Sequence, residues 1–368
     1  MKIILIGNNA GGMANFRGAL IKELQRQNHE VCVAVPNNPT EPKQKEIFEL
    51  GVKIIWTSMD RRGQNIVKDF RVIREYYAML KREKPDLVVT YTIKPNVYAG
   101  IACRLLKIPF AANITGLGTA FQKKNALQAV VSVLYLVSIR KARIVFFENE
   151  ENRDILVKKR LVRKEKTHVL HGAGVEPERF VYQDYPQGDD THFLFMGRLM
   201  KEKGVEELLT ATKRLHEENA NVHLDLLGRL EEDFREAIET AQEEGWLTYH
   251  GVQNDVRPYI AASHCFVLPS WHEGMANTNL ECAASGRPVI TSNIHGCMEA
   301  VEDGVTGFLC RKKDPEDLYR VMKAFTEMPY EQRKAMGVAG RKRMEEIFDK
   351  KKVVAETIRN MMGENEND

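Results

Sequence analysis

Two glutamates eight positions apart flank a short run of small and amide residues in the stretch HEGMANTNLE, residues 272–281. The stretch follows an apolar run and leads into a segment with helical spacing. A helix that starts after a strand presents main-chain N–H groups and partial positive charge, so it can bind an anion. Carboxylates accept hydrogen bonds from hydroxyls and repel bare phosphate. The pattern therefore suits a phosphate that carries a sugar on either side.

The placement of the two carboxylates depends on where this helix begins. Asn277 or Thr278 can serve as its N-cap and Gly286 can end it. Glu281 then lies about one turn inside the helix, and Glu273 lies on the loop before it. The alternative is that Glu273 is an ordinary loop charge and Glu281 an exposed helix residue.

A second group of charged residues follows an earlier apolar run. The stretch FMGRLMKEKGVEELL, residues 195–209, ends a strand at Gly197 and then offers Arg198 and Lys203 before a helix near Gly204. A guanidinium binds two phosphate oxygens at once and an ammonium supplies a compact positive charge, which suits a diphosphate. A lysine at a helix start is usually solvated. Both cations after one strand favour the diphosphate interpretation over the solvated one.

Short β-branched runs alternate with helical segments along nearly the whole chain, which predicts an α/β fold of two doubly wound parallel sheets. A polar, proline-containing stretch at 174–190 separates the two patterns. We place the first domain at 1–173 and the second at 174–348. In the remaining residues, 349–368, we expect a helix at 349–363 that crosses back onto the first domain. The expected strands are 2–7, 31–36, 52–57, 86–91, 109–114, 143–148, 167–170, 192–197, 222–228, 247–250, 265–270, 287–292 and 307–310.

The second half resembles the nucleotide-sugar domain of the retaining GT-B glycosyltransferases of family four. The signature of that family is a glutamate, seven residues and a second glutamate, matched here by Glu273 and Glu281. The likeness continues through GAGVEPERF, GRLMKEKG and GCMEAVEDGVTGFL. It implies a GT-B fold, with two Rossmann-like domains facing a central cleft and the acceptor bound by the first.

The resemblance also implies roles for individual residues. Arg198 and Lys203 would hold the donor diphosphate, and Glu281 the ribose hydroxyls. Glu273 would hold the transferred sugar together with the main chain of Gly274–Asn277. The implied catalytic residues are Glu273, Arg198 and Lys203, and the implied donor-binding residues are Gly197, Arg198, Lys203, Glu273, Gly274, Met275, Ala276, Asn277 and Glu281.

Two loops of the first half are expected to line the acceptor side of the cleft. GNNAGGMANFRGAL, residues 7–20, lacks the dinucleotide spacing G-x-G-x-x-G, which weakens an NAD interpretation. NITGLGTAFQ, residues 113–122, is the second loop, with a flexible connection as its alternative. The candidate residues are Gly11, Gly12, Arg17, Asn113, Thr115 and Gly116. A surface helix charge is the alternative for Arg17, and no histidine ends the fifth expected strand, where many relatives place one.

Composition limits cofactors and partners. The first 180 residues carry 31 Lys and Arg against 17 Asp and Glu, whereas the remainder is acidic. A basic half suits an anionic, lipid-linked saccharide or an anionic membrane, although solvated helix faces would look the same. Nucleic acid is disfavoured because no aromatic stacking platform accompanies the charge. No Asp-x-Asp and no Cys-x-x-Cys occurs, so we expect no metal and no cofactor. The six cysteines are expected to be small buried residues.

Together with these observations, the resemblance implies an enzyme that moves a hexose or N-acetylhexosamine from a UDP-sugar to a saccharide acceptor with retention, metal-independently. We expect the acceptor to be polyprenyl-diphosphate-linked or a surface-polysaccharide precursor, and the protein to be cytoplasmic with a peripheral contact to the inner face of the membrane. The alternatives are a sugar-nucleotide epimerase on the same fold, which would release sugar without an acceptor, and a non-catalytic nucleotide-sugar-binding protein.

Overall fold

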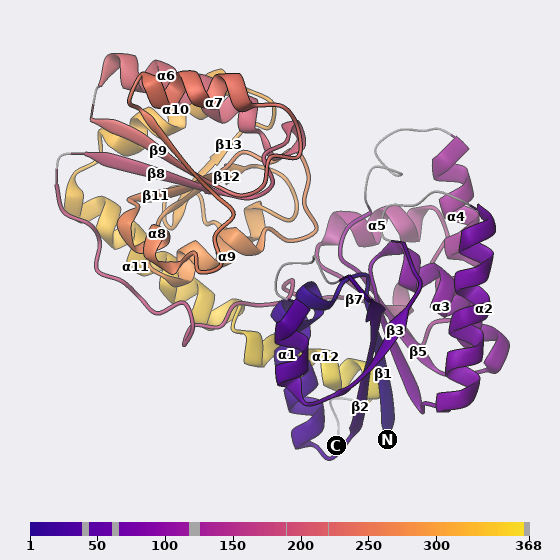
Figure 1. Cartoon of the computed structure of the whole chain (residues 1–368). Helices are drawn as coiled ribbons and strands as arrows, with labels where there is room; N and C mark the ends of the chain where they lie inside the picture. Colours follow the sequence, from indigo (N-terminus) through magenta and orange to yellow (C-terminus); the bar gives the residue numbers. More distant parts are fainter. Residues whose placement is uncertain (39–43, 61–65, 118–125, 189, 220, 364–368) are drawn as a thin grey trace. The chain divides into compact units, whose positions relative to one another are not determined.

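The computed structural model describes residues 1–38, 44–60, 66–117, 126–188, 190–219 and 221–363 (Figure 1). The chain forms two compact units, Met1–Ala173 with Lys351–Asp368, and Gly174–Lys350. Each unit contains one parallel sheet with helices on both faces, as the alternation of strand and helix patterns predicts. All thirteen expected strands are present, with ends within two residues of the expected ones.

The first unit has a sheet of order β3-β2-β1-β4-β5-β6-β7. Its strands are almost continuously buried, because helices cover both faces and the β-branched runs therefore face apolar neighbours on each side. The strands are β1 (Lys2–Ile6), β2 (Glu30–Pro36), β3 (Lys53–Thr57), β4 (Leu87–Tyr91), β5 (Phe110–Ile114), β6 (Ile144–Phe147) and β7 (Thr167–Val169). The helices are α1 (Ala10–Arg26), α2 (Ile66–Glu83), α3 (Ile93–Leu106), α4 (Ala126–Ser138) and α5 (Glu150–Lys158).

The last helix, α12 (Lys350–Met362), packs on the first sheet although it follows the second unit in the chain. Val354, Ile358 and Met361 join the same apolar cluster as α1 and β1. On the opposite face, α2, α3, α4 and α5 enclose a separate cluster. The expected return of the terminal helix to the first domain is confirmed.

The second unit has a sheet of order β10-β9-β8-β11-β12-β13 around a single apolar core. Its strands are β8 (Thr191–Met196), β9 (Val222–Leu227), β10 (Leu247–Gly251), β11 (Cys265–Leu268), β12 (Val289–Ser292) and β13 (Gly307–Cys310). The helices are α6 (Val205–Glu218), α7 (Arg235–Glu243), α8 (Arg257–Ala262), α9 (Asn277–Ala284), α10 (Pro315–Thr326) and α11 (Tyr330–Ile347). All six cysteines of the chain are buried free thiols, as expected.

Within the second unit, a buried arginine joins part of the polar stretch at 174–190 to α8. Arg287 is fully buried and donates hydrogen bonds to the carbonyl oxygens of Gln183, at 2.9 Å, and Asp184, at 3.0 Å. The same guanidinium bonds to the carbonyl oxygens of Ile260 and Ala261 in α8. One charged side chain thereby satisfies main-chain acceptors of residues 183 and 184, which belong to no helix or strand.

Candidate functional site

The two groups of charged residues in the second unit follow adjacent strands. β8 and β11 pair in parallel at the centre of the sheet, although β9 and β10 separate them in the chain. In a doubly wound sheet such a switch point leaves a crevice beyond the carboxyl ends of the two strands. Gly197, Arg198 and Lys203 follow β8, and residues 269–276 follow β11. The sheet order therefore brings both predicted groups to the carboxyl ends of two neighbouring strands.

Lys203 and Glu273 form an ion pair across these two loops. The Lys203 Nζ donates a hydrogen bond to Glu273 Oε1, and their side chains are 19% and 12% exposed, respectively. Partial burial strengthens such a charge-assisted bond relative to one in open solvent. The sequence placed one residue on each of two separate loops, and the structure joins them in one site.

Additional hydrogen bonds tie the two loops together beside this pair. The main-chain N–H of Trp271 donates to the carbonyl oxygen of Glu202 at 2.9 Å, and the Ser270 hydroxyl donates to the same oxygen at 3.1 Å. The indole Nε1 of Trp271 donates to Glu207 Oε1, at 2.9 Å, in the first turn of α6. Gly204 lies so close to the Pro269 carbonyl that a side chain there would overlap it. The relative position of Lys203 and Glu273 is thus fixed by main-chain as well as side-chain contacts.

The start of α9 has no side-chain cap. We expected Asn277 or Thr278 to be the N-cap, but the helix begins at Asn277 and its N-cap is Ala276. The turn before this helix is held by the loop after the next strand, β12, where the Gly296 carbonyl oxygen accepts a hydrogen bond at 2.7 Å from the main-chain N–H of Ala276. A helix terminus that no side chain caps retains its positive end for a ligand.

Gly296 also allows the loop after β12 to lie directly against the main chain of Glu273 and Gly274. Its φ is +89°, and a Cβ at this position would lie 2.7 Å from the carbonyl oxygens of Glu273 and Gly274. Only glycine combines this backbone conformation with such an approach. Gly296 is not among the predicted site residues, although its position just after a predicted strand was a usable signal.

The remaining donor-site candidates of the second unit differ in exposure. Gly197 directly follows β8, and its N–H donates to the carbonyl oxygen of Leu227. Arg198 is exposed and makes no hydrogen bond or ion pair with any other residue that the structure describes. Met275 and Ala276 are buried, so they offer main-chain groups rather than side chains. Glu281 is partly exposed in the second turn of α9.

In the first unit, Gly12 serves the start of α1. Asn9 is the N-cap of α1, and its Oδ1 accepts a hydrogen bond at 2.6 Å from the Gly12 N–H. A Cβ on Gly12 would overlap this Asn9 oxygen. Gly11 is buried in the same turn. These contacts give the predicted glycine loop a structural reason that is independent of any ligand.

Arg17 is neither exposed nor unpaired. Its side chain is 12% exposed, its Nη2 lies 3.1 Å from Glu148 Oε1, and its guanidinium stacks 4.6 Å from the ring centre of Tyr91. Burial raises the pKa of the Tyr91 hydroxyl to about 12, so that group remains neutral. The alternative of a solvated surface charge is therefore wrong for Arg17, which joins the carboxyl ends of β4 and β6.

Asn113 belongs to a buried hydrogen-bond network within the first sheet. It is 4% exposed, and its Nδ2 donates at 3.3 Å to the carbonyl oxygen of Thr90. The Asn96 side chain donates in turn to the Asn113 carbonyl oxygen at 2.8 Å. Thr115 and Gly116 are partly exposed beyond the end of β5, and residues 118–122 of this predicted loop lie outside the described residues. Asn113 thus has a role in joining β4, β5 and α3.

No group of three or more His, Cys, Asp and Glu side chains within the described ranges could hold a metal ion. The charge that could neutralise a bound anion in the second unit comes instead from Arg198, Lys203 and the start of α9. Cations beside an uncapped helix start form an arrangement that stabilises a diphosphate and the negative charge that develops on it when it leaves.

Both halves of the chain match families of known proteins. The family described as glycosyl transferases group 1 matches residues 190–327, and the glycosyl transferase 4-like domain matches residues 11–173. A similar protein from Campylobacter jejuni is named N,N'-diacetylbacillosaminyl-diphospho-undecaprenol alpha-1,3-N-acetylgalactosaminyltransferase. It is 25% identical over 86% of this chain and 87% of its own length.

Two further relatives complete the comparison. An Escherichia coli protein named UDP-Gal:alpha-D-GlcNAc-diphosphoundecaprenol alpha-1,3-galactosyltransferase is 28% identical over 72% of this chain and 73% of its own. The crystal structure of HepE from Anabaena, in complex with UDP and glucose, superimposes with a TM-score of 0.81 at 16% identity, covering 99% of this chain and 100% of that one. The structural likeness shows the GT-B fold. Both halves of the chain therefore match glycosyltransferase families, and the chain is a glycosyltransferase with the GT-B fold.

Proposed function

We propose that this enzyme transfers a hexose or an N-acetylhexosamine from a UDP-sugar to a saccharide carried on a polyprenyl diphosphate, with retention of anomeric configuration and without a bound metal. The observation that carries the proposal is the Lys203–Glu273 ion pair beside the uncapped start of α9. The proposal is supported because a cation suited to phosphate and a carboxylate suited to sugar hydroxyls lie together beyond the carboxyl ends of β8 and β11. Both curated relatives above are named for diphospho-undecaprenol acceptors, and one is named for a UDP-galactose donor.

The proposed donor contacts follow from charge. Arg198 and Lys203 bind the diphosphate, so Lys203 must turn from Glu273 to phosphate when the donor enters. Glu273 then accepts hydrogen bonds from the transferred sugar, together with the main chain of residues 274–277, and Glu281 accepts them from the ribose. The bond from the anomeric carbon to the diphosphate oxygen breaks as the bond to the acceptor oxygen forms. The leaving phosphate takes the proton of the acceptor hydroxyl on the same face of the sugar.

The first unit is proposed to bind the acceptor at the carboxyl ends of its strands. Thr115 and Gly116, which are partly exposed after β5, offer a hydroxyl and main-chain groups there, and Gly11 and Gly12 shape the start of α1. Arg17 and Asn113 support these ends through their contacts with Glu148 and Thr90. A lipid-linked acceptor would confine the reaction to the surface of a membrane. No helix among the described residues has the length and apolar character that crossing one requires.

The proposal is tested by incubating the purified chain with a panel of UDP-sugars and a polyprenyl-diphosphate-linked monosaccharide. We expect UDP release to depend on the acceptor, the lipid-linked product to gain one sugar, and its new linkage to have the anomeric configuration of the donor. Activity is expected to persist in a chelator. Release of free sugar without acceptor would instead indicate the epimerase, and UDP binding without turnover the non-catalytic alternative. Inversion or loss of activity in the chelator would overturn the corresponding part of the proposal.

A further inference from the structure

One helix of the first unit presents an apolar stripe to solvent. α4 carries no charged residue along its whole length, and Val130, Val133 and Val137 are 56%, 59% and 40% exposed. Their spacing of three and four positions places them on one face of the helix. A helix that is apolar nearly all round is normally buried, yet this face of α4 is not. Among the described residues no other helix exposes more than one large hydrophobic side chain.

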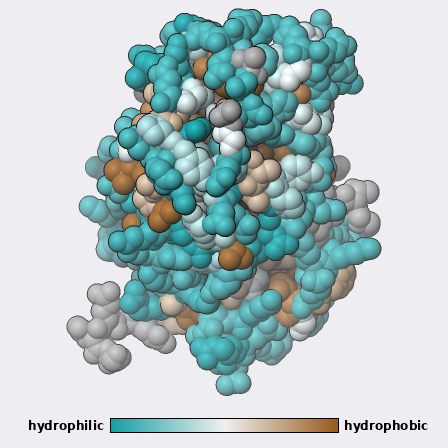
Figure 2. Space-filling model, turned by 90° about the vertical axis from the view of Figure 1, so that its left-hand side faces the viewer, coloured by the Kyte–Doolittle hydropathy of each residue, from teal (hydrophilic) through white to brown (hydrophobic). Residues whose placement is uncertain are grey.

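Elsewhere on the protein, exposed apolar residues need no explanation. In the face drawn in Figure 2, hydrophilic residues cover most of the surface and hydrophobic residues occur in small groups. Single apolar side chains such as Val338 on α11, at 47% exposure, are normal for a folded protein. The three valines on α4 differ because they form a continuous stripe.

The charge around this stripe has one sign. No aspartate or glutamate occurs between Asp86 and Glu148, whereas the same stretch contains eight lysines and arginines. Lys107 follows α3, and Arg140 and Lys141 follow α4; all three are exposed. The two helices lie side by side on one face of the sheet (Figure 1), where Arg104 of α3 donates a hydrogen bond at 2.8 Å to the carbonyl oxygen of Val137.

We propose that this α4 face, defined as Val130, Val133 and Val137 with Lys107, Arg140 and Lys141, docks on a bilayer of anionic lipid. The proposal rests on the proposed function in that a lipid-linked acceptor would be presented there. The valines enter the boundary between headgroups and acyl chains, and the cations pair with lipid phosphates. A second copy of this chain is a poorer occupant, because a symmetric contact would oppose two surfaces that both lack carboxylates.

Vesicle co-sedimentation tests the α4 face with the full chain. We expect binding to vesicles of phosphatidylglycerol and phosphatidylethanolamine, weaker binding as salt rises, and little binding to phosphatidylcholine alone. Arg140→Glu with Lys141→Glu should lower the partition coefficient about 30-fold or more. The matched control is Arg235→Glu with Lys342→Glu, two residues of the second unit whose side chains are 72% and 74% exposed, and it should bind like the wild type.

A second variant probes the apolar part of the face. Val130→Ser with Val133→Ser and Val137→Ser should also lose vesicle binding, whereas Val338→Ser should not. If the triple serine variant fails to fold, vesicle binding by the variant with Arg140→Glu and Lys141→Glu alone decides whether the α4 face binds lipid. Wild-type vesicle binding in the charge variant would overturn the α4 face. So would a dimer in light scattering that the triple variant abolishes, because the face would then belong to a second copy.

Failure of the α4 face and failure of the proposed function give different results. With a short-chain, water-soluble prenyl-diphosphate saccharide and no vesicles, the charge variant should transfer sugar at the wild-type rate. Transfer without any vesicle binding by the wild type would refute the docking surface and leave the function intact. Vesicle binding without transfer to either acceptor would refute the function and leave the docking surface intact.

Discussion

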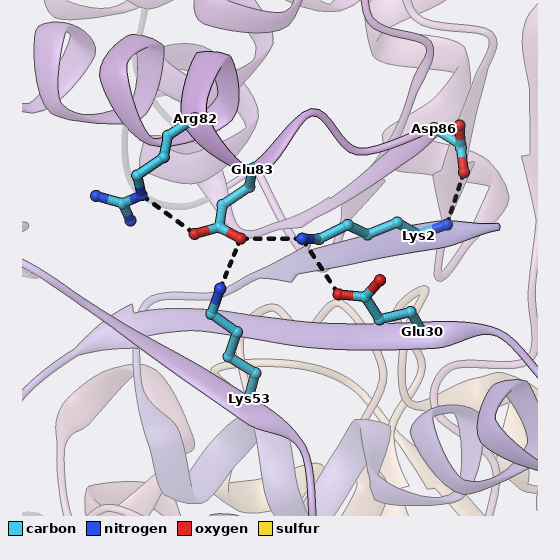
Figure 3. A network of polar contacts seen from close by, with 6 residues as sticks. All are labelled: Lys2, Glu30, Lys53, Arg82, Glu83 and Asp86. Atoms are coloured by element: carbon cyan, nitrogen blue, oxygen red, sulfur yellow. Dashed lines mark hydrogen bonds and ion pairs between the residues drawn. The ribbon is translucent and has the colours of Figure 1, made fainter.

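A charged cluster at the amino ends of the first sheet's strands and another at the carboxyl ends of the second sheet's strands show how structural and ligand-binding charges differ. At the amino ends of the first sheet, Glu83 accepts hydrogen bonds from Lys53 Nζ at 2.7 Å, Lys2 Nζ at 3.0 Å and Arg82 Nε at 3.2 Å (Figure 3). At the carboxyl ends of the second sheet, Lys203 pairs with Glu273 while the nearby Arg198 is exposed.

The difference is in what the cations do. Lys2, Lys53 and Glu83 come from β1, β3 and α2, so the Glu83 cluster joins three elements of the first unit. Its bonds, chiefly the one from Lys53, lower the pKa of Glu83 to about 2. On the loop that carries Lys203, by contrast, Arg198 remains exposed just after β8. We infer that charged side chains paired between elements of the fold, as in the Glu83 cluster, serve stability. A cation that stays exposed at strand carboxyl ends, such as Arg198, serves a ligand.

The largest effect is expected for Lys203→Ala. It removes a cation proposed to stabilise the leaving diphosphate, so turnover should fall about 100- to 1000-fold. The fold should be retained, because the pair lies on two loops outside the apolar core. Steady-state kinetics with the preferred UDP-sugar and circular dichroism measure the two quantities. Lys201→Ala is the control, since Lys201 lies on the same short turn with a side chain 60% exposed. Unchanged turnover in Lys203→Ala would remove the diphosphate assignment.

Arg198→Ala should reduce turnover about 100-fold and weaken UDP binding, with no loss of stability because the side chain has no partner within the described residues. Arg198→Lys should recover only part of the activity, because a lysine lacks the planar fork that binds two oxygens. Calorimetric titration with UDP measures the affinity, and Arg235→Ala on α7 is the control. If Arg198→Ala bound UDP as the wild type does, the exposed cation would have no part in the donor site.

Glu83→Gln should act on stability rather than activity. Three cations would lose their shared carboxylate, so the free energy of unfolding should fall by about 2 kcal/mol, with turnover of the folded enzyme unchanged. Because the pKa of Glu83 is lowered in the folded state, its contribution is present above the unfolded pKa and lost as pH falls toward about 2. The difference between wild type and variant should therefore shrink on acidification.

Urea unfolding at several pH values measures this contribution. Glu165→Gln is the control, because the Glu165 side chain is 66% exposed in a pair with Arg163. Such an exposed pair is expected to contribute less than about 1 kcal/mol. A difference between Glu83→Gln and wild type that stayed constant from neutral to acidic pH would show that the carboxylate does not act through its charge.

The sequence predicted the sheets well because buried parallel strands are short β-branched runs, a pattern that needs no knowledge of distant contacts. It also placed Lys203 and Glu273 in one expected site, because residue type and a strand-end position pointed to the same chemistry; the structure joins these two residues in an ion pair, and their roles toward a ligand stay predictions. In the first unit the same reasoning selected Gly12 and Asn113. There the structure gives the glycine a role in capping α1 and the asparagine a role in a buried network, because such residues meet local needs as readily as ligands.

The contacts that fix the site were not predictable from local pattern. Trp271 and Glu207 lie 64 positions apart, and only the packing of α6 beside the loop after β11 brings them together. Arg287 looks like a solvated charge at the start of a strand, but it is fully buried among main-chain carbonyl oxygens. Both cases depend on contacts between loops, whose geometry is set by the rest of the fold.

Trp271→Phe should produce the smallest effect and reports on how the two loops of the donor site are joined. The ring is kept but the Nε1–H is lost, so Glu207 Oε1 loses its donor while Glu207 Oε2 is already buried without a partner. An unsatisfied buried acceptor should lower the free energy of unfolding by about 1 kcal/mol. Because Lys203 and Glu273 flank this contact, UDP affinity should fall severalfold. Glu207→Gln should have a smaller effect, since its amide oxygen still accepts.

The matched control for the indole is Trp56→Phe. Trp56 lies in β3 of the first unit and is 38% exposed, so its loss should leave UDP affinity unchanged. Denaturant unfolding and calorimetric titration with UDP separate stability from affinity for all three variants. If Trp271→Phe lost stability but bound UDP normally, the bond to Glu207 would be purely structural. It would then resemble the Glu83 cluster more than the Lys203 cluster. The inferred difference between a structural role at the amino ends of strands and a ligand-binding role at the carboxyl ends would then hold for the charged residues alone.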